Sequence, residues 1–357
     1  MRQILIAFLM LWATSAFGAT NTYYVNPAAA ADGDGTTTGT TGADCAFDNL
    51  NDFADLDADC SSDIYICEIS GTGADTTKVF FDGWTNVDAL GQIVVNVAVA
   101  YRHDGTRGTG YYLNIDDAGG AIYLADPYIT LNGLSLTNSN GSGEGVSISS
   151  DGDYSVITNT LVYDCDGTAG VLIASNGTNC IMINSFIYGC GRGISLGAEP
   201  SIIANCTVMN SGDYGISRTN YVNASVYNTF VGGSGTSDYY ETGTSDSFNI
   251  YYSMSEDATV DDYGEGDNQT PNVTYDTNLL TNVTATSENG NLPVGSTLID
   301  AAHDYDGETW WSSYCENVGD GTDYTDVTRA GTWDIGPDEY AAAGVTSEIY
   351  SHYRSQQ

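Results

Sequence analysis

The chain has 357 residues and a formal net charge of −39, from 8 basic and 47 acidic residues. A molecule this acidic repels phosphate groups, which excludes nucleic acid and anionic membrane surfaces as partners. Glycine (42) and tyrosine (26) are abundant and proline (6) is scarce, a composition that disfavours long amphipathic helices. We therefore expect an all-β protein rich in turns.

The first residues have the pattern of a secretory signal peptide. Arg2 precedes an apolar run from Ile4 to Trp12, and Ala16 and Gly18 are spaced as at a cleavage site. The apolar run is too short to span a bilayer, and no second one follows it. We predict a signal peptide over residues 1–19 and a secreted, extracellular or cell-surface protein that is not membrane-spanning.

Residues 20–62 are predicted to form an N-terminal strand, a loop and a capping helix. The strand is expected at Tyr23–Val25. The helix is expected over residues 46–56, where Phe47, Leu50, Phe53 and Leu56 recur at helical spacing. A helix here suits the open end of a repeat array, which needs a cap. Apolar runs at residues 64–69 and 92–100 then predict buried strands.

From about residue 128 to residue 255 a short pattern recurs. One column consists of Asn159, Asn184, Asn205, Asn228 and Asn249, at intervals of 25, 21, 23 and 21 residues. A second consists of small residues, Cys165, Cys190, Ser211, Ser234 and Ser255. A third is glycine before a β-branched residue, at Gly145, Gly170, Gly193 and Gly215. An earlier segment fits the register if Gly133 lies opposite Asn159.

A unit of about 22 residues cannot bury its own apolar side and must stack on its neighbours. Residues of equal phase then lie above one another, so that Val162, Ile187, Val208 and Val231 form an internal aliphatic ladder. The asparagines form a structural ladder at a turn, where their amides can bond along the stack and left-handed backbone is tolerated. The periodicity predicts a solenoid.

At both ends the chain resembles a known family. The opening TYYVNPA and the closing DYDG and TRAGTWDIGPDEY are similar to secreted right-handed parallel β-helix proteins of the pectate-lyase-like superfamily. They resemble most the bacterial extracellular group that ends in a DIGxxEY element. The resemblance implies a right-handed parallel β-helix over residues 63–295, an irregular capping element over 296–341 and a polar tail over 342–357. A long insertion between Gly307 and Arg329 departs from the family pattern.

Enzymes of that superfamily cleave acidic polysaccharides, by β-elimination with an Arg or Lys base or by hydrolysis with a cluster of Asp residues. Arg192 is the catalytic candidate that this resemblance suggests. It shares an outward column with Glu144, Ala169 and Tyr214, and Asp164 is expected across a turn. The alternative is a surface arginine paired with nearby carboxylates.

Two other arginine-containing segments have structural alternatives. Arg218 takes the place of Ile148, Ile173 and Leu196 in earlier repeats, which indicates a distorted strand or a buried ion pair. The segment around His103, with Arg102 and Arg107, could bind an anionic sugar or form a solvated turn.

Tyr163 and Tyr188 are candidate glycan-binding residues. Each follows a column asparagine by four residues, so both are expected to point outward, side by side, with Asp164 and Glu144 nearby. Exposed aromatic rings can hold sugars, and flanking carboxylates can accept hydrogen bonds from hydroxyl groups. The alternative is that the tyrosines only fill a flat β surface.

Asp304, Asp306 and Glu308 place oxygen ligands on alternate residues of a tight turn, as Ca²⁺ prefers, although such turns also occur without metal. Cys165 and Cys190 lie at one phase of successive coils, about 4.8 Å apart, within disulfide range. The alternative is a ladder of reduced, small side chains.

Three hypotheses of function follow. The first is an extracellular or cell-surface β-helix that binds a polysaccharide or builds surface structure, which the scarcity of candidate bases favours. The second is a polysaccharide lyase or glycoside hydrolase acting on the long face of the coil. The third is a self-associating filament or adhesin subunit, joined end to end or laterally.

Overall fold

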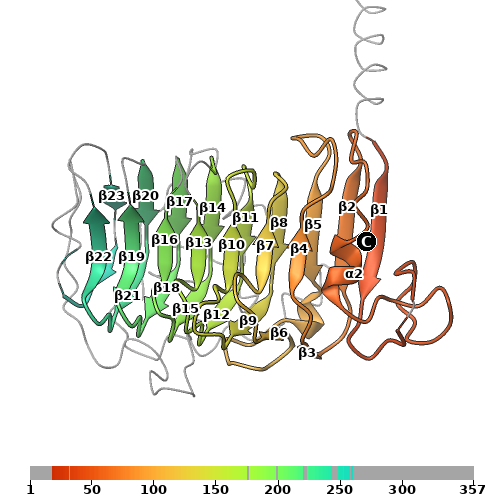
Figure 1. Ribbon diagram of the computed structural model, residues 1–357, viewed down its shortest axis with the longest axis horizontal. Coiled ribbons are helices and arrows are strands. Elements are labelled where there is room, and N and C mark those ends of the chain that lie inside the picture. The colour runs from red at the N-terminus through yellow and green to blue at the C-terminus, as the bar shows by residue number, and fades with distance from the viewer. Residues whose placement is uncertain are drawn as a thin grey trace, which may run out of the picture.

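The described molecule consists mainly of three parallel β-sheets that run along one common axis, and successive coils of the chain stack along that axis (Figure 1). The computed structural model describes residues 18–31, 33–174, 177–197, 200–219, 223–242, 248–251, 253–257 and 259. The expected signal peptide, the C-terminal capping element, the polar tail and the calcium candidates Asp304, Asp306 and Glu308 lie outside these residues. No helix in the described part is long and apolar enough to cross a membrane.

We call the sheets A, B and C. Sheet A consists of β1 (Thr20–Val25), β2 (Ile64–Ile69), β5 (Ile93–Val97), β8 (Ile129–Asn132), β11 (Val156–Thr158), β14 (Cys180–Ile183), β17 (Ser201–Ala204), β20 (Ala224–Tyr227) and β23 (Phe248–Tyr251). Sheet B consists of β4 (Val79–Phe81), β7 (Ile122–Leu124), β10 (Val146–Ile148), β13 (Val171–Ile173), β16 (Ile194–Leu196), β19 (Tyr214–Thr219) and β22 (Ser237–Thr242). Sheet C consists of β3 (Gly73–Asp75), β6 (Tyr111–Ile115), β9 (Ser135–Asn138), β12 (Leu161–Tyr163), β15 (Phe186–Tyr188), β18 (Thr207–Met209), β21 (Phe230–Gly232) and β24 (Met254–Ser255).

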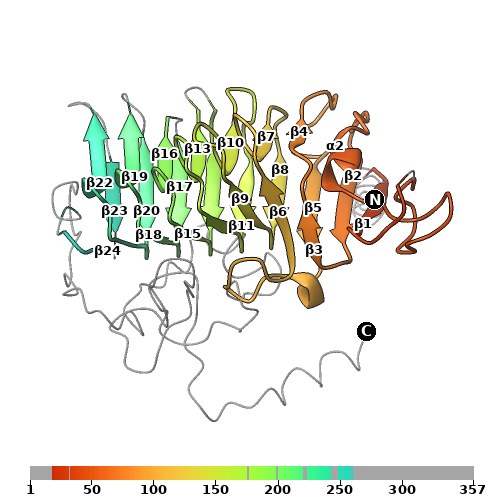
Figure 2. The ribbon, with the colours of Figure 1, turned by 60° about the horizontal axis from the view of Figure 1, so that its bottom comes forward.

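The chain visits sheets A, C and B in turn and then returns to sheet A one layer higher. From β2 onward, each strand pairs in parallel with the strand three places later, as β8 does with β11 and β12 does with β15. Figure 2 shows the coils following one another from the N-terminal end. The fold is a right-handed parallel β-helix, which confirms the expected fold class.

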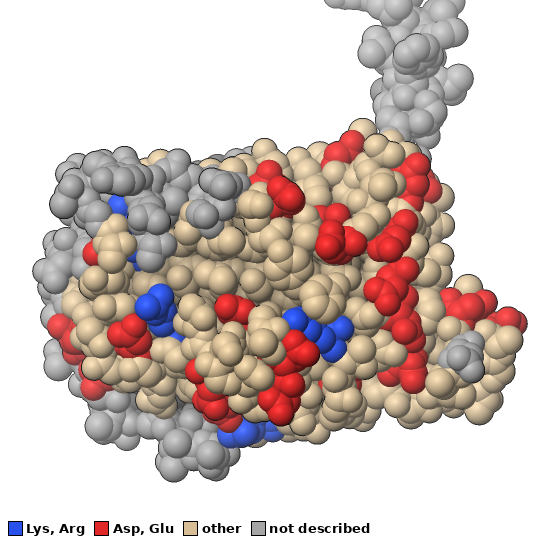
Figure 3. All heavy atoms as spheres, viewed as in Figure 1, with Lys and Arg blue, Asp and Glu red and all other residues tan. Residues whose placement is uncertain are grey.

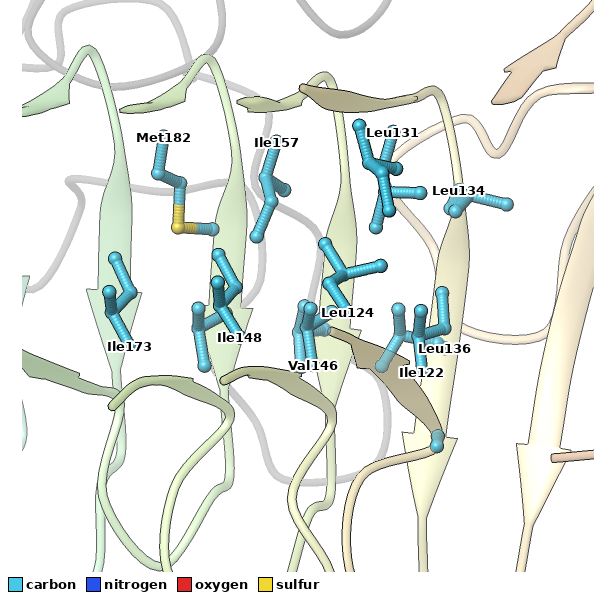
Figure 4. Close-up of a cluster of buried hydrophobic side chains, with 14 of the residues drawn as sticks. Ile122, Leu124, Leu131, Leu134, Leu136, Val146, Ile148, Ile157, Ile173 and Met182 are labelled. Atoms are coloured by element: carbon cyan, nitrogen blue, oxygen red, sulfur yellow. The ribbon is translucent and has the colours of Figure 1, made fainter. Parts of the chain in front are cut away.

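The core is a set of aliphatic ladders enclosed by the three sheets. Val162 pairs in register with Ile187, and the same row continues through Val208 and Val231, all fully buried. Figure 4 shows Val146, Ile148 and Ile173 of sheet B pointing into the space shared with Leu131 and Ile157 of sheet A. Each coil thus buries its apolar side on its neighbours, as the repeat length requires.

The asparagine column forms the corner between sheets A and C. Asn159, Asn184, Asn205 and Asn228 have φ between +44° and +50°, the left-handed region that asparagine tolerates. Asn205 Nδ2 donates to Asn184 Oδ1 over 3.3 Å. Gly133, with φ +78°, does occupy the equivalent turn. Asn159 Nδ2 bonds instead to Asn132 Oδ1, at 2.8 Å.

Asn249 does not belong to this column, contrary to the sequence prediction. It lies within β23, opposite Ser225 of β20, three residues before the phase of Asn228. The 21-residue interval was coincidental, because strand pairing sets the register and this coil is longer than the interval implied. The same shift places Ser255 opposite Val231 and not opposite Ser234.

The N-terminal end carries one short helix, α2 (Leu50–Ala54), and a 3₁₀ turn, η1 (Val99–Tyr101), follows β5. Helix α2 is shorter than the expected 46–56, and it begins after Asn49, whose side chain accepts a hydrogen bond from Asp52 N. Leu50 and Phe53 are fully buried. Phe53 contacts the rings of Phe81 and Trp84, so the helix closes the aromatic end of the core.

Arg218 is fully buried within the coil, where its row pairs it with Leu196 and Glu241. Its Nη2 forms an ion pair with Glu241 Oε1. The guanidinium also lies 6.0 Å from the centroid of the Phe248 ring. Of the two alternatives from the sequence, the structure contains the buried ion pair.

Candidate functional site

A segment that we call the strap, residues 98–110, connects β5 to β6 and lies outside the corner between sheets A and C. His103 of the strap is 3% exposed, and its Nε2 lies 2.9 Å from the carbonyl oxygen of Asn159. Its Nδ1 accepts a hydrogen bond from Gly105 N. Burial lowers the pKa of His103 from 6.5 to about 4, so the ring is neutral and Nε2 donates. This residue anchors the strap and does not lie in a solvated turn.

Tyr163 and Tyr188 stack as expected, with ring centroids 5.8 Å apart and an angle of 17° between the rings. They are not exposed, however: 3% of Tyr163 and none of Tyr188 is accessible. The sequence interpretation was wrong on this point, because strand alternation places a side chain outside the coil but does not reveal what covers it. The Arg107 guanidinium, from the strap, lies 5.2 Å from the Tyr163 ring centroid.

Asp164 follows Tyr163 with φ +47°, where sheet C begins to turn toward sheet B, and the strap reaches this residue as well. Its Oδ2 lies 2.6 Å from Arg107 Nη1, and both side chains are about one-third exposed, 33% and 34%. Burial raises the pKa of Asp164, and Arg107 partly opposes this increase. Asp164 is therefore paired with the strap and not with Arg192.

Arg192 lies in the next coil, at the end of the turn from sheet C to sheet B and two residues before β16. The column predicted for it exists: Gly145 N bonds to Ala169 O, Gly170 N to Arg192 O and Gly193 N to Tyr214 O. Glu144 lies two coils from Arg192, about 10 Å along the axis, so the two side chains are not adjacent.

Around Arg192 is a group that we call the Arg192 cluster: Arg192, Asp213, Tyr214, Thr236 and Tyr240. Arg192 Nε donates to Asp213 Oδ2 over 3.3 Å, and the two side chains are 34% and 38% exposed. The guanidinium lies 5.6 Å from the Tyr214 ring centroid. Tyr240 stacks on Tyr214 at 3.9 Å and 6°. Thr236 Oγ1 donates to Asp213 Oδ1.

The cluster has unused hydrogen-bonding groups that face solvent. Arg192 uses Nε for Asp213, and its Nη atoms have no other partner among the described residues. The hydrogen bond between the Tyr214 and Tyr240 hydroxyls, followed by burial, raises the pKa of Tyr214. The cluster thus presents donors, acceptors and aromatic edges on one half-exposed surface.

The cluster is poorly arranged for general-base catalysis by Arg192. A guanidinium must lose a proton to act as a base, and the Asp213 carboxylate stabilises the protonated form. Among the described residues, no group of three or more His, Cys, Asp or Glu side chains could hold a metal ion. The cluster can hydrogen-bond and pack against a ligand more readily than it can abstract a proton.

Lys and Arg side chains are few on the face that Figure 3 shows, and Asp and Glu side chains cover more of it. Lys78 pairs with Asp117, Arg107 with Asp164 and Arg192 with Asp213. Arg102 donates to Val97 O and Asn96 Oδ1, and Arg218 pairs with Glu241 inside the coil. Lys78, Arg107 and Arg192 are therefore each compensated by a carboxylate, and Arg218 is compensated and buried.

Cys165 and Cys190 are free thiols in neighbouring coils, so the reduced alternative describes them and the expected disulfide is absent. Hydrogen bonding between the two thiols, and then burial, raises the pKa of Cys165 well above its usual range. Both side chains are at most 2% exposed. They fill the inside of the turn from sheet C to sheet B, beside Gly170, where an added Cβ would lie 2.9 Å from Cys190 Sγ.

Sequence reasoning missed Tyr240 and the role of the strap. Tyr240 falls outside the asparagine register, because β19 and β22 are six residues long where the five earlier strands of sheet B have three. The strap contacts residues more than 50 positions away, as His103 does with Asn159. The one signal in the sequence for an aromatic group beside Arg192 was Tyr214, which the sequence places in the same outward column as Arg192.

No family model matches this chain, and no curated protein sequence matches it. Among solved structures, the crystal structure of pectate lyase Pel9A is similar over 92% of this chain and 98% of that one, with 12% identity and a TM-score of 0.49. The full-length tailspike protein 2 of the Escherichia coli O157:H7 bacteriophage CAB120 is similar over 68% of this chain, with 11% identity and a TM-score of 0.29. This chain spans 39% of that tailspike's length. The fold assignment rests on the three sheets of this chain itself, and no activity is carried over from either protein.

Proposed function

We propose that this chain is an extracellular β-helix that binds a polysaccharide through the Arg192 cluster, without catalysis of its own. The observation that carries the proposal is the ion pair of Arg192 and Asp213 beside the stacked rings of Tyr214 and Tyr240. A few converging polar groups beside aromatic surface are what a sugar-binding site requires. The compensated charge of the pair avoids the desolvation cost of an isolated ion.

The chemistry of each member matches a sugar. The free Nη donors of Arg192 suit ring and hydroxyl oxygens, and Asp213 accepts from hydroxyl groups. Tyr240 and Tyr214 supply flat apolar surface, and their hydroxyls add two polar groups at the edge. Polysaccharide cleavage is disfavoured, because Arg192 is ion-paired with Asp213, Asp164 is ion-paired with Arg107, and Glu144 lies two coils away from Arg192.

The test is binding and turnover measured together. Purified protein is run through native gels that contain individual neutral or acidic polysaccharides, and the same mixtures are assayed for reducing ends and for unsaturated products. We expect retardation by at least one polysaccharide without product. Arg192→Ala is expected to weaken binding at least about tenfold, because it removes hydrogen bonds from a charged donor.

Lys78→Ala is the matched control. Lys78 pairs with Asp117 at 3.0 Å and lies 4.7 Å from the centroid of the Phe80 ring, so it repeats the chemistry of Arg192 elsewhere along sheet B. We expect this variant to bind as the unmodified protein does. Equal loss in both variants would indicate a non-specific charge effect. Product formation by the unmodified protein that disappears in Arg192→Ala would show that the cluster is a catalytic site and would contradict the proposal.

A further inference from the structure

Tyr128 and Tyr154 form an exposed stacked pair where sheet B turns into sheet A. Their ring centroids are 4.6 Å apart with an angle of 7° between the rings. Tyr154 is 44% exposed, one of the most exposed large apolar side chains in the described chain. Neither tyrosine belongs to the Arg192 cluster or to the buried corner.

Both tyrosines adopt a backbone conformation that bulky residues avoid. Their φ angles are +54° and +57°, and Asn179, at the equivalent turn of the next coil, has φ +56°. Asparagine accepts the left-handed region readily, whereas a tyrosine there is strained. The turn does not need an aromatic ring, since Asn179 makes the same turn without one. Strain at an exposed position that packing does not require suggests a role in binding.

Because Asn179 is smaller than Tyr154, the surface drops in height from one coil to the next. We call this drop, between Tyr154 and Asn179, the step. One face of the Tyr154 ring is covered by Tyr128. On the other side lies the next coil, where Asn179, shorter than a tyrosine, donates to Thr178 Oγ1, and Tyr154 is 44% exposed. An open aromatic face of this kind packs against the apolar face of a sugar ring.

Two carboxylates flank the step. Asp88 Oδ1 accepts hydrogen bonds from Leu90 N and Gly91 N, and these bonds lower the pKa of Asp88. Asp153 Oδ1 accepts from Thr178 N. The second oxygen of each carboxylate takes no hydrogen bond from the described residues. These oxygens suit the hydroxyls of a sugar and repel the carboxylate of a uronic acid.

The step and the Arg192 cluster lie at opposite edges of sheet B. Tyr154 follows β10 and Arg192 precedes β16, two strands away, about 10 Å along the axis. Between them, Ser147, Leu172 and Ser195 lie in one row, in which Ser147 is 8% exposed and Ser195 5%. This row is low because two of its three side chains are serines. An oligosaccharide can cross it, whereas a monosaccharide cannot reach both edges.

We propose that Tyr154, backed by Tyr128, is a second subsite for a neutral polysaccharide that crosses sheet B from the Arg192 cluster. The proposal rests on the proposed function and specifies its ligand as uncharged. The choice of a neutral glycan follows from the carboxylates at the step and from the ion pair that compensates Arg192 at the other edge of sheet B.

The test compares Tyr154→Asn with the unmodified protein, on mixed-linkage β-glucan, galactomannan and dextran as neutral probes and polygalacturonate and alginate as acidic ones. Tyr154→Asn copies the residue of the next coil, so it removes the ring and relieves the backbone. We expect an affinity about tenfold lower for the bound neutral glycan, with a thermal midpoint equal to or above that of the unmodified protein. Tyr154→Trp is expected to keep binding.

Phe80→Asn is the matched control, since Phe80 is also an exposed aromatic residue of sheet B, at 42%. It is expected to bind as the unmodified protein does. Undiminished binding by Tyr154→Asn, a lowered thermal midpoint of that variant, or preference for a polyuronate would each overturn the proposal. If Arg192→Ala loses binding and Tyr154→Asn does not, only the second subsite is refuted. If the unmodified protein binds no glycan, both proposals are refuted.

Discussion

The region that the strap covers, which is sheet C with its corner to sheet A, and the outer face of sheet B contain similar residues. These residues are buried in the first region and exposed in the second. In the region that the strap covers, Tyr163, Tyr188 and His103 are at most 3% exposed, and Arg107 of the strap pairs with Asp164. On the sheet B side, Tyr154 and the Arg192 cluster keep rings and polar atoms open to solvent. The comparison teaches that a repeated outward column can be structural, and that exposure separates a binding surface from a second layer of core.

The largest expected effect is at the buried corner. Asn159→Ala removes the bond to Asn132 Oδ1 and places alanine at φ +50°. We expect the free energy of unfolding, measured in urea, to fall by about 3 kcal/mol, from an unsatisfied amide and a strained backbone. Asn159→Gly is the control, because it loses the bond but not the backbone fit, and it should fall less. Equal losses would contradict the role of the turn.

His103 gives the corner a pH dependence of known sign. Its pKa is lowered from 6.5 to about 4, so the unfolded chain binds a proton at a pH where the folded chain does not. Its contribution to stability is therefore full above pH 6.5 and is lost as pH falls toward about 4. The charges near it are Arg102, which lowers the pKa, and Asp104, which raises it.

The measurement is the difference in stability between the unmodified protein and His103→Gln, from pH 7 to pH 4. We expect the unmodified protein to be the more stable at pH 7, and the difference to shrink by up to about 3 kcal/mol on acidification. Comparing the two removes the contribution of the carboxylates, which titrate in both. A difference that is constant with pH would contradict a neutral, buried ring.

A smaller effect is expected for Arg107→Ala, which releases the strap from Asp164 and from the Tyr163 ring. Both charged groups are about one-third exposed, so solvent screens the pair, and we expect a loss of about 1 kcal/mol. Affinity for glycan should not change, because the strap is not part of the open face. Loss of glycan binding in this variant would indicate that the binding site lies at the strap and not on sheet B.

The smallest effect is expected from reductant. Cys165 and Cys190 are free, so adding dithiothreitol should shift the thermal midpoint by less than about 1 °C, whereas a disulfide typically contributes about 2–4 kcal/mol. Native protein should also resist alkylation, since both thiols are buried. A thermal midpoint that falls by several degrees in dithiothreitol would indicate that Cys165 and Cys190 form a disulfide after all.

The sequence predicted the closed part of this molecule better than the open part. The asparagine period located the corner from Asn159 to Asn228, because stacked coils force equal phases to coincide. It failed at Asn249, where the true coil length depends on pairing between β20 and β23. It also could not reveal that the strap covers Tyr163, since that contact joins residues far apart in the chain.

The open face left a weaker trace in the sequence. Tyr128, Tyr154 and Asn179 are spaced 26 and 25 residues apart, a fourth column in which two bulky residues precede an asparagine. That change of residue type within one column indicates a position under a demand other than stacking. Arg192 was found by its rarity, but its partner Asp213 and the ring of Tyr240 required the structure.

The most direct test of the open and closed faces is hydroxyl-radical footprinting of tyrosines with and without a saturating neutral polysaccharide. We expect Tyr154 and Tyr240 to be modified in the free protein and protected in the complex. Tyr163 and Tyr188 should remain unmodified in both states. Modification of Tyr163 and Tyr188 that the glycan suppresses, with Tyr154 and Tyr240 unaffected, would contradict the assignment of the binding surface to sheet B.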